Sequence, residues 1–261
     1  MASTVIGLFF LFGILIANYV VYLVKNEVDK TSPMVGALAG SAPYDFEQVW
    51  QTTSYVSGCL LLLPGLLLII LMTNEFTYKT HRQNIIDGWS RQQFIDVKLM
   101  LVLVLTSMAT LMVIITALIF GFSSGTSFSL EHFESVGYFF LKALSYNMIA
   151  MLMATLIRKT GFAIGVFVVY LCAENIISVL LEVWSGRIKG NHHIDLGNMG
   201  DYLPMNASDG MLHFPNNTIT NMAKNSDFFP SNYLYVTLPL AILYLVLFVW
   251  WSRNRIIKTD L

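Results

Sequence analysis

Six stretches of the chain combine high apolar content with very few charges, at lengths that match a membrane crossing. A helix rises about 1.5 Å per residue, so about 20 residues cross a hydrocarbon core of about 30 Å. The six stretches are residues 5–24, 55–73, 99–120, 135–157, 161–183 and 233–251. The pattern predicts an all-α integral membrane protein with six transmembrane helices in one domain over residues 1–261. A signal peptide is the alternative for the first stretch, but no Lys or Arg precedes it and its apolar run is long.

Six crossings place both termini on the same side of the membrane, and the basic residues indicate which side. Loops on the cytoplasmic side carry an excess of Lys and Arg. On the side of the termini lie Lys79, Arg82, Arg91, Lys98, Arg158, Lys159, Arg253, Arg255 and Lys258. On the other side lie Lys25, Lys30, Arg187, Lys189 and Lys224. The distribution predicts cytoplasmic termini in a plasma membrane, which would be the inner membrane of a bacterium.

The composition agrees with a membrane protein and narrows its partners. Hydrophobic residues make up 56% of the chain and charged residues 12%, about half the charged fraction of a soluble domain. The formal net charge of -1 supplies no basic excess for a nucleic acid, so none is expected as a partner. Cys59 and Cys172 lie in apolar runs and are predicted to be free, buried thiols.

The connection between the second and third stretches, residues 74–98, is longer than a simple turn requires. It contains Ile85, Ile86 and Trp89 among basic residues, and Ser90 is placed to cap a helix that continues into the third stretch. Two short helices with these apolar anchors could dock into a groove of another protein. The alternative is an amphipathic hairpin that lies on anionic lipid headgroups.

The same connection resembles the first cytoplasmic loop of the permease subunits of type-2 ATP-binding-cassette exporters. The residues that carry the resemblance are Glu75, Lys79, Thr80, Arg82, Gly88, Ser90, Arg91 and Lys98. In that family the loop forms a coupling helix that sits in a cleft of a separate ATPase subunit, and two permease copies share one path. The resemblance implies a homodimer or heterodimer of permeases joined to ATPase subunits.

The resemblance assigns the ATPase-coupling role to Glu75, Thr80, Arg82, Gly88, Ser90 and Arg91. Arg82 and Arg91 would make charge-assisted contacts with the ATPase, and Ile85, Ile86 and Trp89 would supply the apolar anchor. No G-x-x-x-x-G-K-[ST] phosphate loop occurs in the chain, so ATP and Mg²⁺ are expected to be used by the partner subunit. The chain itself is expected to be no enzyme and to bind no cofactor.

Two charged residues, Lys142 and Glu174, fall inside the fourth and fifth stretches. Charges inside a membrane are costly and face protein or water, so the two are predicted to pair. The pair could hold neighbouring helices together, or it could contact the substrate.

The segment between the last two stretches, residues 184–232, is rich in Asn, Gly and Asp. Apolar islands at residues 202–205 and 211–215 are expected to form short helices that dip into the membrane interface. His192, His193 and Asp195 lie close together, but without a third anchored ligand they do not predict a metal site.

The pattern and the resemblance together predict the permease subunit of an exporter. An ion- or proton-coupled secondary transporter that uses Lys142 and Glu174 is the alternative. An intramembrane enzyme is a further one, although the H-E-x-x-H pattern of zinc peptidases is absent.

Overall fold

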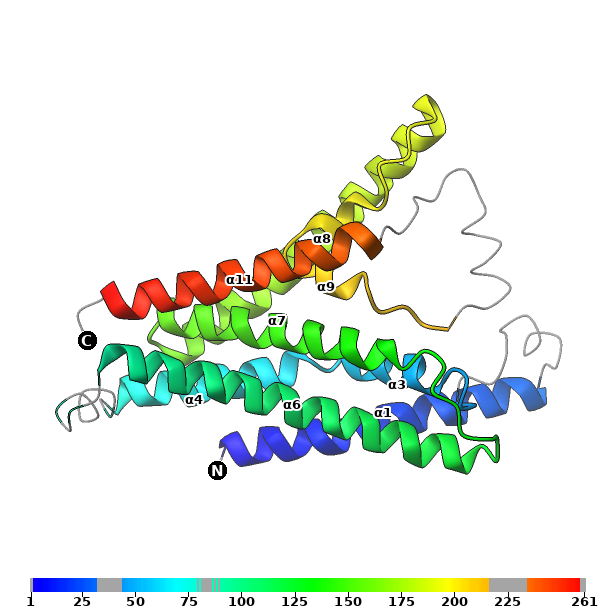
Figure 1. Ribbon diagram of the computed structural model, residues 1–261, viewed down its shortest axis with the longest axis horizontal. Helices are drawn as coiled ribbons and strands as arrows, with labels where there is room; N and C mark the ends of the chain where they lie inside the picture. Colours follow the sequence, from blue (N-terminus) through cyan, green and yellow to red (C-terminus); the bar gives the residue numbers. More distant parts are fainter. Residues whose placement is uncertain are drawn as a thin grey trace.

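The computed structural model describes residues 2–31, 44–78, 80, 86, 88, 90–215 and 234–258, and within these ranges the regular structure is helical (Figure 1). The elements are α1 (Ala2–Thr31), α3 (Val49–Gly58), α4 (Leu62–Thr77), α6 (Arg91–Ser123), α7 (Glu134–Leu156), α8 (Thr160–His192), the 3₁₀ helix η1 (Met199–Tyr202), α9 (Asn206–Asp209) and α11 (Leu234–Lys258). The predicted all-α fold is confirmed for this part of the chain.

Five of the described helices, namely α1, α6, α7, α8 and α11, are long and apolar enough to cross a membrane. Helices α3 and α4 pass the same test only as a pair, and they are bent by 47° against each other. The fold therefore provides five spans, or six if the bent pair crosses as one.

The bend falls inside the predicted second stretch, at residues 59–61. Pro64 has no backbone N–H, so it cannot donate to the carbonyl of Leu60, and its ring crowds that carbonyl. The chain makes tighter turns there, with Leu60 N–H donating to Ser57 O and Leu63 N–H donating to Leu60 O, both at 3.0 Å. The hydrogen bond that Pro64 cannot make is therefore missing one turn before the proline, and the helix bends there.

Two helices extend well beyond their predicted ends. Helix α6 begins eight residues before Leu99, at Arg91, and α8 continues nine residues past Val183, to His192. Neither extension contains a proline, and α8 ends where His193 adopts a left-handed conformation with φ 54°. At about 1.5 Å per residue, the 33 residues of α8 reach about 50 Å, which exceeds the hydrocarbon core by about 20 Å.

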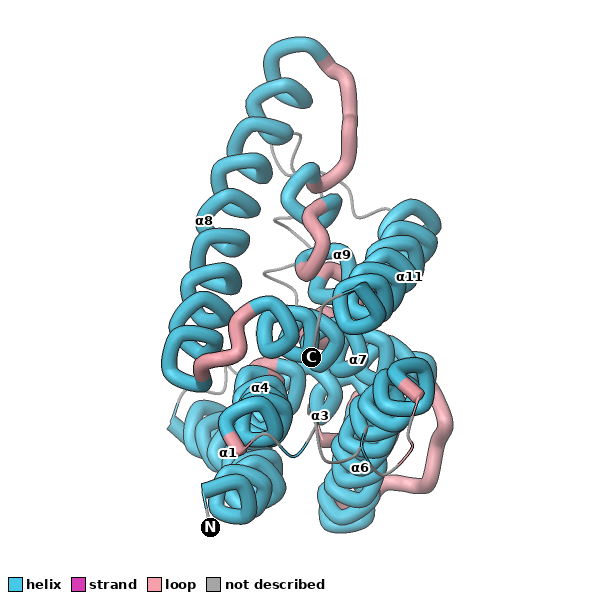
Figure 2. The backbone as a smooth tube through the Cα atoms, turned by 90° about the vertical axis from the view of Figure 1, so that its left-hand side faces the viewer, coloured by secondary structure: helices cyan, strands magenta, loops and turns pink. Residues whose placement is uncertain are grey.

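Helix α7 lies at the centre of the bundle, with α3, α4, α6, α8 and α11 around it (Figure 2). Two thirds of its apolar window is buried, against 11% for α8. Small residues such as Ala143, Ala150 and Ala154 allow the neighbours of α7 to approach closely, and all three are fully buried. The other helices therefore turn most of their apolar surface outward, as lipid-facing helices do.

The helix ends gather at two levels. The ends of α4, α7 and α11 lie at one end of the bundle with the starts of α6 and α8, and we call this the terminal side. The starts of α3 and α7 and the end of α6 lie at the other end, the opposite side (Figure 1). The predicted short turn between the fourth and fifth stretches is found on the terminal side, at residues 157–159.

Both cysteines are free, as predicted, but they are exposed rather than buried. The prediction of burial was wrong because an apolar position on a membrane helix can face lipid as well as protein.

Candidate functional site

The connection between α4 and α6 is shorter than the 25 residues predicted, because both helices extend into it. Only residues 78–90 lie between the end of α4 at Thr77 and the start of α6 at Arg91. Arg82, Ile85 and Trp89 lie outside the described residues, so their predicted roles stay predictions. Ile86 is 82% exposed, which leaves this predicted anchor free of the rest of the bundle.

The start of α6 is fixed by the cap that the sequence predicts. Ser90 Oγ accepts from the N–H of Gln93 at 3.2 Å, and Gln93 Oε1 accepts from the N–H of Ser90 at 2.9 Å. This reciprocal pair is a capping box, which stabilises the first turn of a helix. Gly88 has φ +96°, a left-handed conformation that glycine adopts without strain, so the chain can turn sharply before the cap.

A buried ion pair joins the two helices at the base of this connection. Lys98 Nζ on α6 donates to Glu75 Oε1 on α4, and the ammonium also lies 5.0 Å from the centre of the Phe94 ring. Lys98 is only 7% exposed. The residue that opens the predicted coupling loop is therefore attached directly to the first turns of α6.

The same level of the bundle is also attached to α8 and α11. Thr73 on α4 and Thr160 on α8 share a hydrogen bond of 2.9 Å. Arg91 Nη1 donates to the carbonyl of Ile257 on α11 at 3.1 Å, and Arg253 lies 3.8 Å from Asp96. Thr80 Oγ1 donates more weakly, at 3.4 Å, to the carbonyl of Glu75. Movement of the connection would consequently reach α4, α6, α8 and α11 together.

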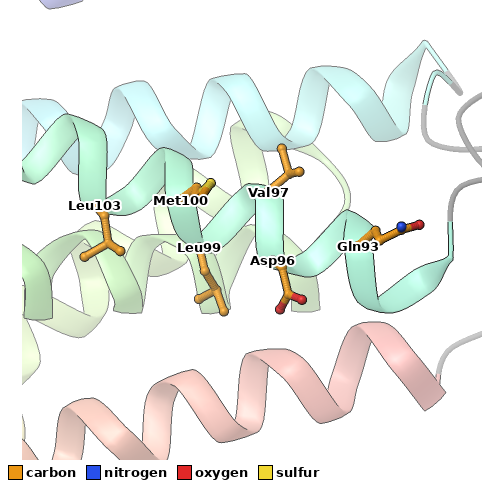
Figure 3. Close-up of a pocket in the computed structure, with 6 residues that line it drawn as sticks. All are labelled: Gln93, Asp96, Val97, Leu99, Met100 and Leu103. Atoms are coloured by element: carbon orange, nitrogen blue, oxygen red, sulfur yellow. The ribbon is translucent and has the colours of Figure 1, made fainter.

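An open groove of about 360 Å³ runs along α6 next to this network (Figure 3). Its lining residues are Gln93, Asp96, Val97, Leu99, Met100 and Leu103. The Asp96, Leu99 and Leu103 side chains point towards α11, whereas Val97 points away from it. Such a surface suits lipid chains rather than chemistry, because it has no buried polar group.

The second predicted site lies on the opposite side of the bundle centre. Lys142 is on α7, about 12 Å along the helix from Glu134, and is 8% exposed. Its ammonium lies 3.3 Å from Asp209 Oδ1 on α9. Tyr146, one turn further on α7, donates to Asp209 Oδ2 at 3.0 Å. The ion-pair partner of Lys142 is thus Asp209 and not Glu174.

Glu174 is bound to the same short segment by a different contact. Its Oε1 accepts the N–H groups of Met205 and Asn206, the latter at 3.1 Å, at the start of α9. Glu174 is 5% exposed. A carboxylate at a helix start satisfies donors that have no partner in the helix. The predicted direct pair is therefore replaced by two separate contacts, from α7 and from α8, with α9 between them.

The segment that these contacts hold, residues 199–214, packs into the bundle rather than standing outside it. Met205, Ala207, Met211 and Leu212 are buried. Phe214 meets Tyr55 of α3 at a ring distance of 5.7 Å. The segment therefore crosses from α8 over α7 to α3. Its short helices are η1 at Met199–Tyr202 and α9 at Asn206–Asp209, beside the apolar islands rather than on them, and residues 211–215 are not helical.

Asp201 belongs to η1, at the start of this segment. Burial raises the pKa of its carboxyl to about 6, although the Asn198 amide, which donates to it at 3.0 Å, lowers the pKa. The nearby carboxylates of Glu182 and Asp209 raise the pKa further. Asp201 is thus a group of this segment that changes charge near neutral pH.

Sequence reasoning missed Asp209, which lies 67 positions from Lys142 in a segment read as polar. The signal available was indirect: Lys142 needs a buried partner, and Asp209 stands between two apolar islands. Among the described residues, no group of three or more His, Cys, Asp or Glu side chains could hold a metal ion. Asp195, near the predicted His192 and His193, is bonded instead to Lys189 at 3.3 Å.

One motif of nucleophilic enzymes occurs by sequence alone. Residues 121–125 read Gly-Phe-Ser-Ser-Gly, which matches G-x-S-x-G. That motif presents a serine on a strand-to-helix turn, whereas Ser123 here ends α6 and its Oγ donates to the carbonyl of Ile119 at 2.7 Å. The geometry of a nucleophile elbow is therefore not formed.

Comparison with known proteins places the chain in a family without an assigned activity. No curated protein matches the sequence. One family model, described as "protein of unknown function (DUF2705)", matches residues 10–261, which is nearly the whole chain. On that match, the chain belongs to the DUF2705 family.

Proposed function

We propose that the chain is the permease subunit of an ATP-binding-cassette transporter that works as an exporter. The observation that carries the proposal is the connection between α4 and α6. Its described residues Tyr78 and Ile86 are exposed, and its base is joined by the Glu75–Lys98 ion pair. An ATPase that binds the connection would move the start of α6 with it, because a capping box and the ion pair with Glu75 fix where α6 starts. Ile86 supplies exposed apolar surface for that contact.

Transmission to the rest of the bundle follows from the contacts of α4 and α6. Both pack along α7, and Thr73 binds Thr160 at the start of α8. Closure of an ATPase dimer would displace the connection, and the helices would carry this displacement to a path on the opposite side. ATP and Mg²⁺ belong to the ATPase subunit in this scheme, and this chain binds neither.

A second permease copy and the lipid bilayer are the remaining partners we propose. Helices α1, α8 and α11 bury little of their apolar windows inside the chain, so lipid or another permease covers them. The basic residues near the terminal side support our proposal that this side faces the cytoplasm and that the protein lies in a plasma membrane.

The test is a pull-down of the tagged chain in mild detergent, with mass spectrometry of the bound proteins and an ATPase assay on the eluate. We expect a stoichiometric ATPase subunit and ATP hydrolysis. A chain that purifies alone from membranes, while a known permease treated in parallel retains its ATPase, would overturn the proposal.

A secondary transporter is the second candidate, and the buried charges Lys142 and Glu174, with the half-buried Asp209, favour it. Intramembrane ionisable groups commonly carry protons or ions in such proteins. Transport that continues without ATP but stops when the proton gradient is dissipated would support this candidate against the first.

A further inference from the structure

One displacement of the α9 segment would break both of its contacts with buried charges, the one with Lys142 and the one with Glu174. Lys142 depends on Asp209, and Glu174 depends on the N–H groups of Met205 and Asn206. Asp209 and the two N–H groups belong to the same five residues, 205–209. If this segment moved away from α7 and α8, Lys142 and Glu174 would lose their partners simultaneously.

Leaving both charges unpaired would be expensive. Lys142 and Glu174 are each more than nine tenths buried, and a buried charge that loses its partner strongly destabilises a protein. A moving segment needs an alternative arrangement of the charges that lowers this cost. Lys142 and Glu174 have opposite charges and lie on α7 and α8, which pack against each other.

Lys142 from α7 and Glu174 from α8 both contact residues 205–209, and tyrosines lie beside both charges. Tyr146 on α7 is in contact with Lys142, whose ammonium lies 5.8 Å from its ring centre, and is within electrostatic range of both Asp209 and Glu174. Tyr170, one turn before Glu174 on α8, lies beside the Glu174 carboxyl. The Oε2 atom of Glu174 is buried beside Tyr170, so an ammonium that reaches this oxygen would pair with a carboxylate that lies out of water.

We propose that Lys142 exchanges ion-pair partners when the 199–214 segment moves. In the closed state Lys142 pairs with Asp209 and Glu174 binds the start of α9. In the open state α9 has left and Lys142 pairs with Glu174. The exchange makes the segment a two-state gate on the opposite side of the path, and in this respect the inference rests on the proposed function. The pair predicted from sequence describes the second of the two states.

The test measures how often the segment leaves the bundle, with a thiol at Ser208 as the reporter. Ser208 is fully buried in α9, and cysteine is close to serine in size, so Ser208→Cys leaves the packing intact. Cys59 and Cys172 are first replaced by serine. The full chain is placed in lipid nanodiscs, and its labelling by a charged, lipid-impermeant maleimide is followed over time.

Asp209→Asn is the first variant. Asparagine still accepts the Tyr146 hydrogen bond, but Lys142 loses its charged partner in the closed state only. The closed state loses its ion pair, whereas Lys142 can still pair with Glu174 in the open state. The open state is therefore populated more often, and we expect labelling of the thiol to become faster by about tenfold or more. Adding Glu174→Gln removes that partner too, so the double variant should return to within about threefold of the reference rate.

Glu174→Gln alone separates the exchange from simple anchoring. The glutamine carbonyl still accepts the N–H groups of Met205 and Asn206, but it cannot pair with Lys142 in the open state. The exchange predicts unchanged or slower labelling. Faster labelling of Glu174→Gln, or equal rates for Asp209→Asn and its double variant with Glu174→Gln, would overturn the proposal.

A second form of the test covers the case in which Asp209→Asn alone does not fold, as judged by gel filtration. In the combination of Lys142→Gln with Asp209→Asn, no lysine remains to be exchanged. Glu174→Gln should then change the labelling rate by less than about twofold, and a larger change would contradict the exchange. Labelling needs no ATPase subunit, so failure of the pull-down and failure of the exchange are separate results.

Discussion

At the scale of single residues, the buried charges of this chain are compensated locally. Lys98 is paired with Glu75 on the terminal side, and Lys142 is paired with Asp209 on the opposite side. The first pair joins helices on either side of one connection, and the second joins elements that are 67 positions apart. The charged residues therefore fix which helices are neighbours, in addition to any part in transport.

Removal of one member of the terminal-side pair should destabilise the bundle. Lys98→Met removes the ammonium that pairs with Glu75, and because Glu75 is partly exposed we expect a loss of about 2 kcal/mol. The loss is measured by unfolding in mixed micelles with increasing dodecyl sulfate. The double variant with Glu75→Gln, in which no charge is left unpaired, should recover most of the stability; equal loss in both would assign the effect to packing.

Arg91 offers a test of the coupling surface. Reversal of its charge in Arg91→Glu should weaken binding of the ATPase about tenfold or more, because a charge-assisted contact becomes a repulsive one. Binding is measured by co-purification at a series of salt concentrations. Arg253→Glu is the matched control: it lies at the same level and pairs with Asp96, outside the connection, and should bind normally.

Asp201 makes the hold on the 199–214 segment depend on pH. Its pKa of about 6 in the folded chain lies above the ordinary value of 3.8, so the folded state binds the proton more tightly than the unfolded state. The stabilising contribution is complete below pH 3.8 and is lost as the pH rises through 6.

We therefore expect hydrogen exchange of residues 199–214, corrected for intrinsic rates, to show weaker protection at pH 7 than at pH 5. Asp201→Asn cannot ionise and should show the same protection at both pH values. A pH dependence that persists in Asp201→Asn would assign the effect to another group, such as His213, which lies in the same segment.

At the scale of elements, the sequence predicts where helices exist better than where they end or break. Apolar runs gave all five long helices, because hydrophobicity alone selects a membrane span. The ends of α6 and α8 were missed, since helices continue past the hydrocarbon wherever nothing interrupts their hydrogen bonds. The 199–214 segment was expected only in outline, because its position depends on Lys142 and Glu174, which are remote in sequence.

In the candidate sites too, local contacts were predicted and contacts between remote residues were not. Ser90 was predicted as a helix cap because a cap depends on residues within one turn, and the capping box confirms it. The partner of Lys142 was predicted wrongly because pairing depends on tertiary packing, for which one sequence offers no periodic signal. The roles of Arg82, Ile85 and Trp89 remain predictions.

Glycine positions distinguish close helix contacts from open surface. A Cβ atom at Gly65 on α4 would lie 2.8 Å from Phe167 Cζ on α8, whereas a Cβ at Gly165 would meet nothing within 4 Å. Gly65→Ala should therefore cost about 1–2 kcal/mol, since overpacking exceeds the gain in helix propensity. Gly165→Ala should be neutral or stabilising by up to about 1 kcal/mol. Thermal aggregation in detergent compares the two, and equal midpoints would contradict the packing of α4 on α8.

At the scale of the whole molecule, one buried helix organises a bundle whose other members face outward. Helix α7 is surrounded on all sides, while α8 leaves the bundle and ends beyond it (Figures 1 and 2). A membrane explains this shape, because the exposed apolar faces would be unstable in water.

The orientation can be tested on intact cells. The end of α8 stands clear of the hydrocarbon, so an epitope inserted after Gly190, where a side chain would have open space, should leave the fold unchanged. We expect antibodies to reach this epitope without permeabilisation and to reach one at the C-terminus only after it. The reverse pattern would place the termini outside and would remove the connection between α4 and α6 from the cytoplasmic ATPase.

The bend between α3 and α4 has a consequence for biogenesis. Helix α3 has 10 residues and α4 has 16, so they reach about 15 Å and 24 Å, and neither can cross the bilayer alone during synthesis. Helix α3 also buries Thr52, Thr53, Ser54 and Ser57, which lipid would not solvate. Asn18 of α1 already reaches Ser57, but the packing of α3 is completed only when α6 and α7 have been made. The insertion machinery must therefore hold α3 at the membrane surface, or in its own polar channel, until the ribosome has delivered the middle of the chain.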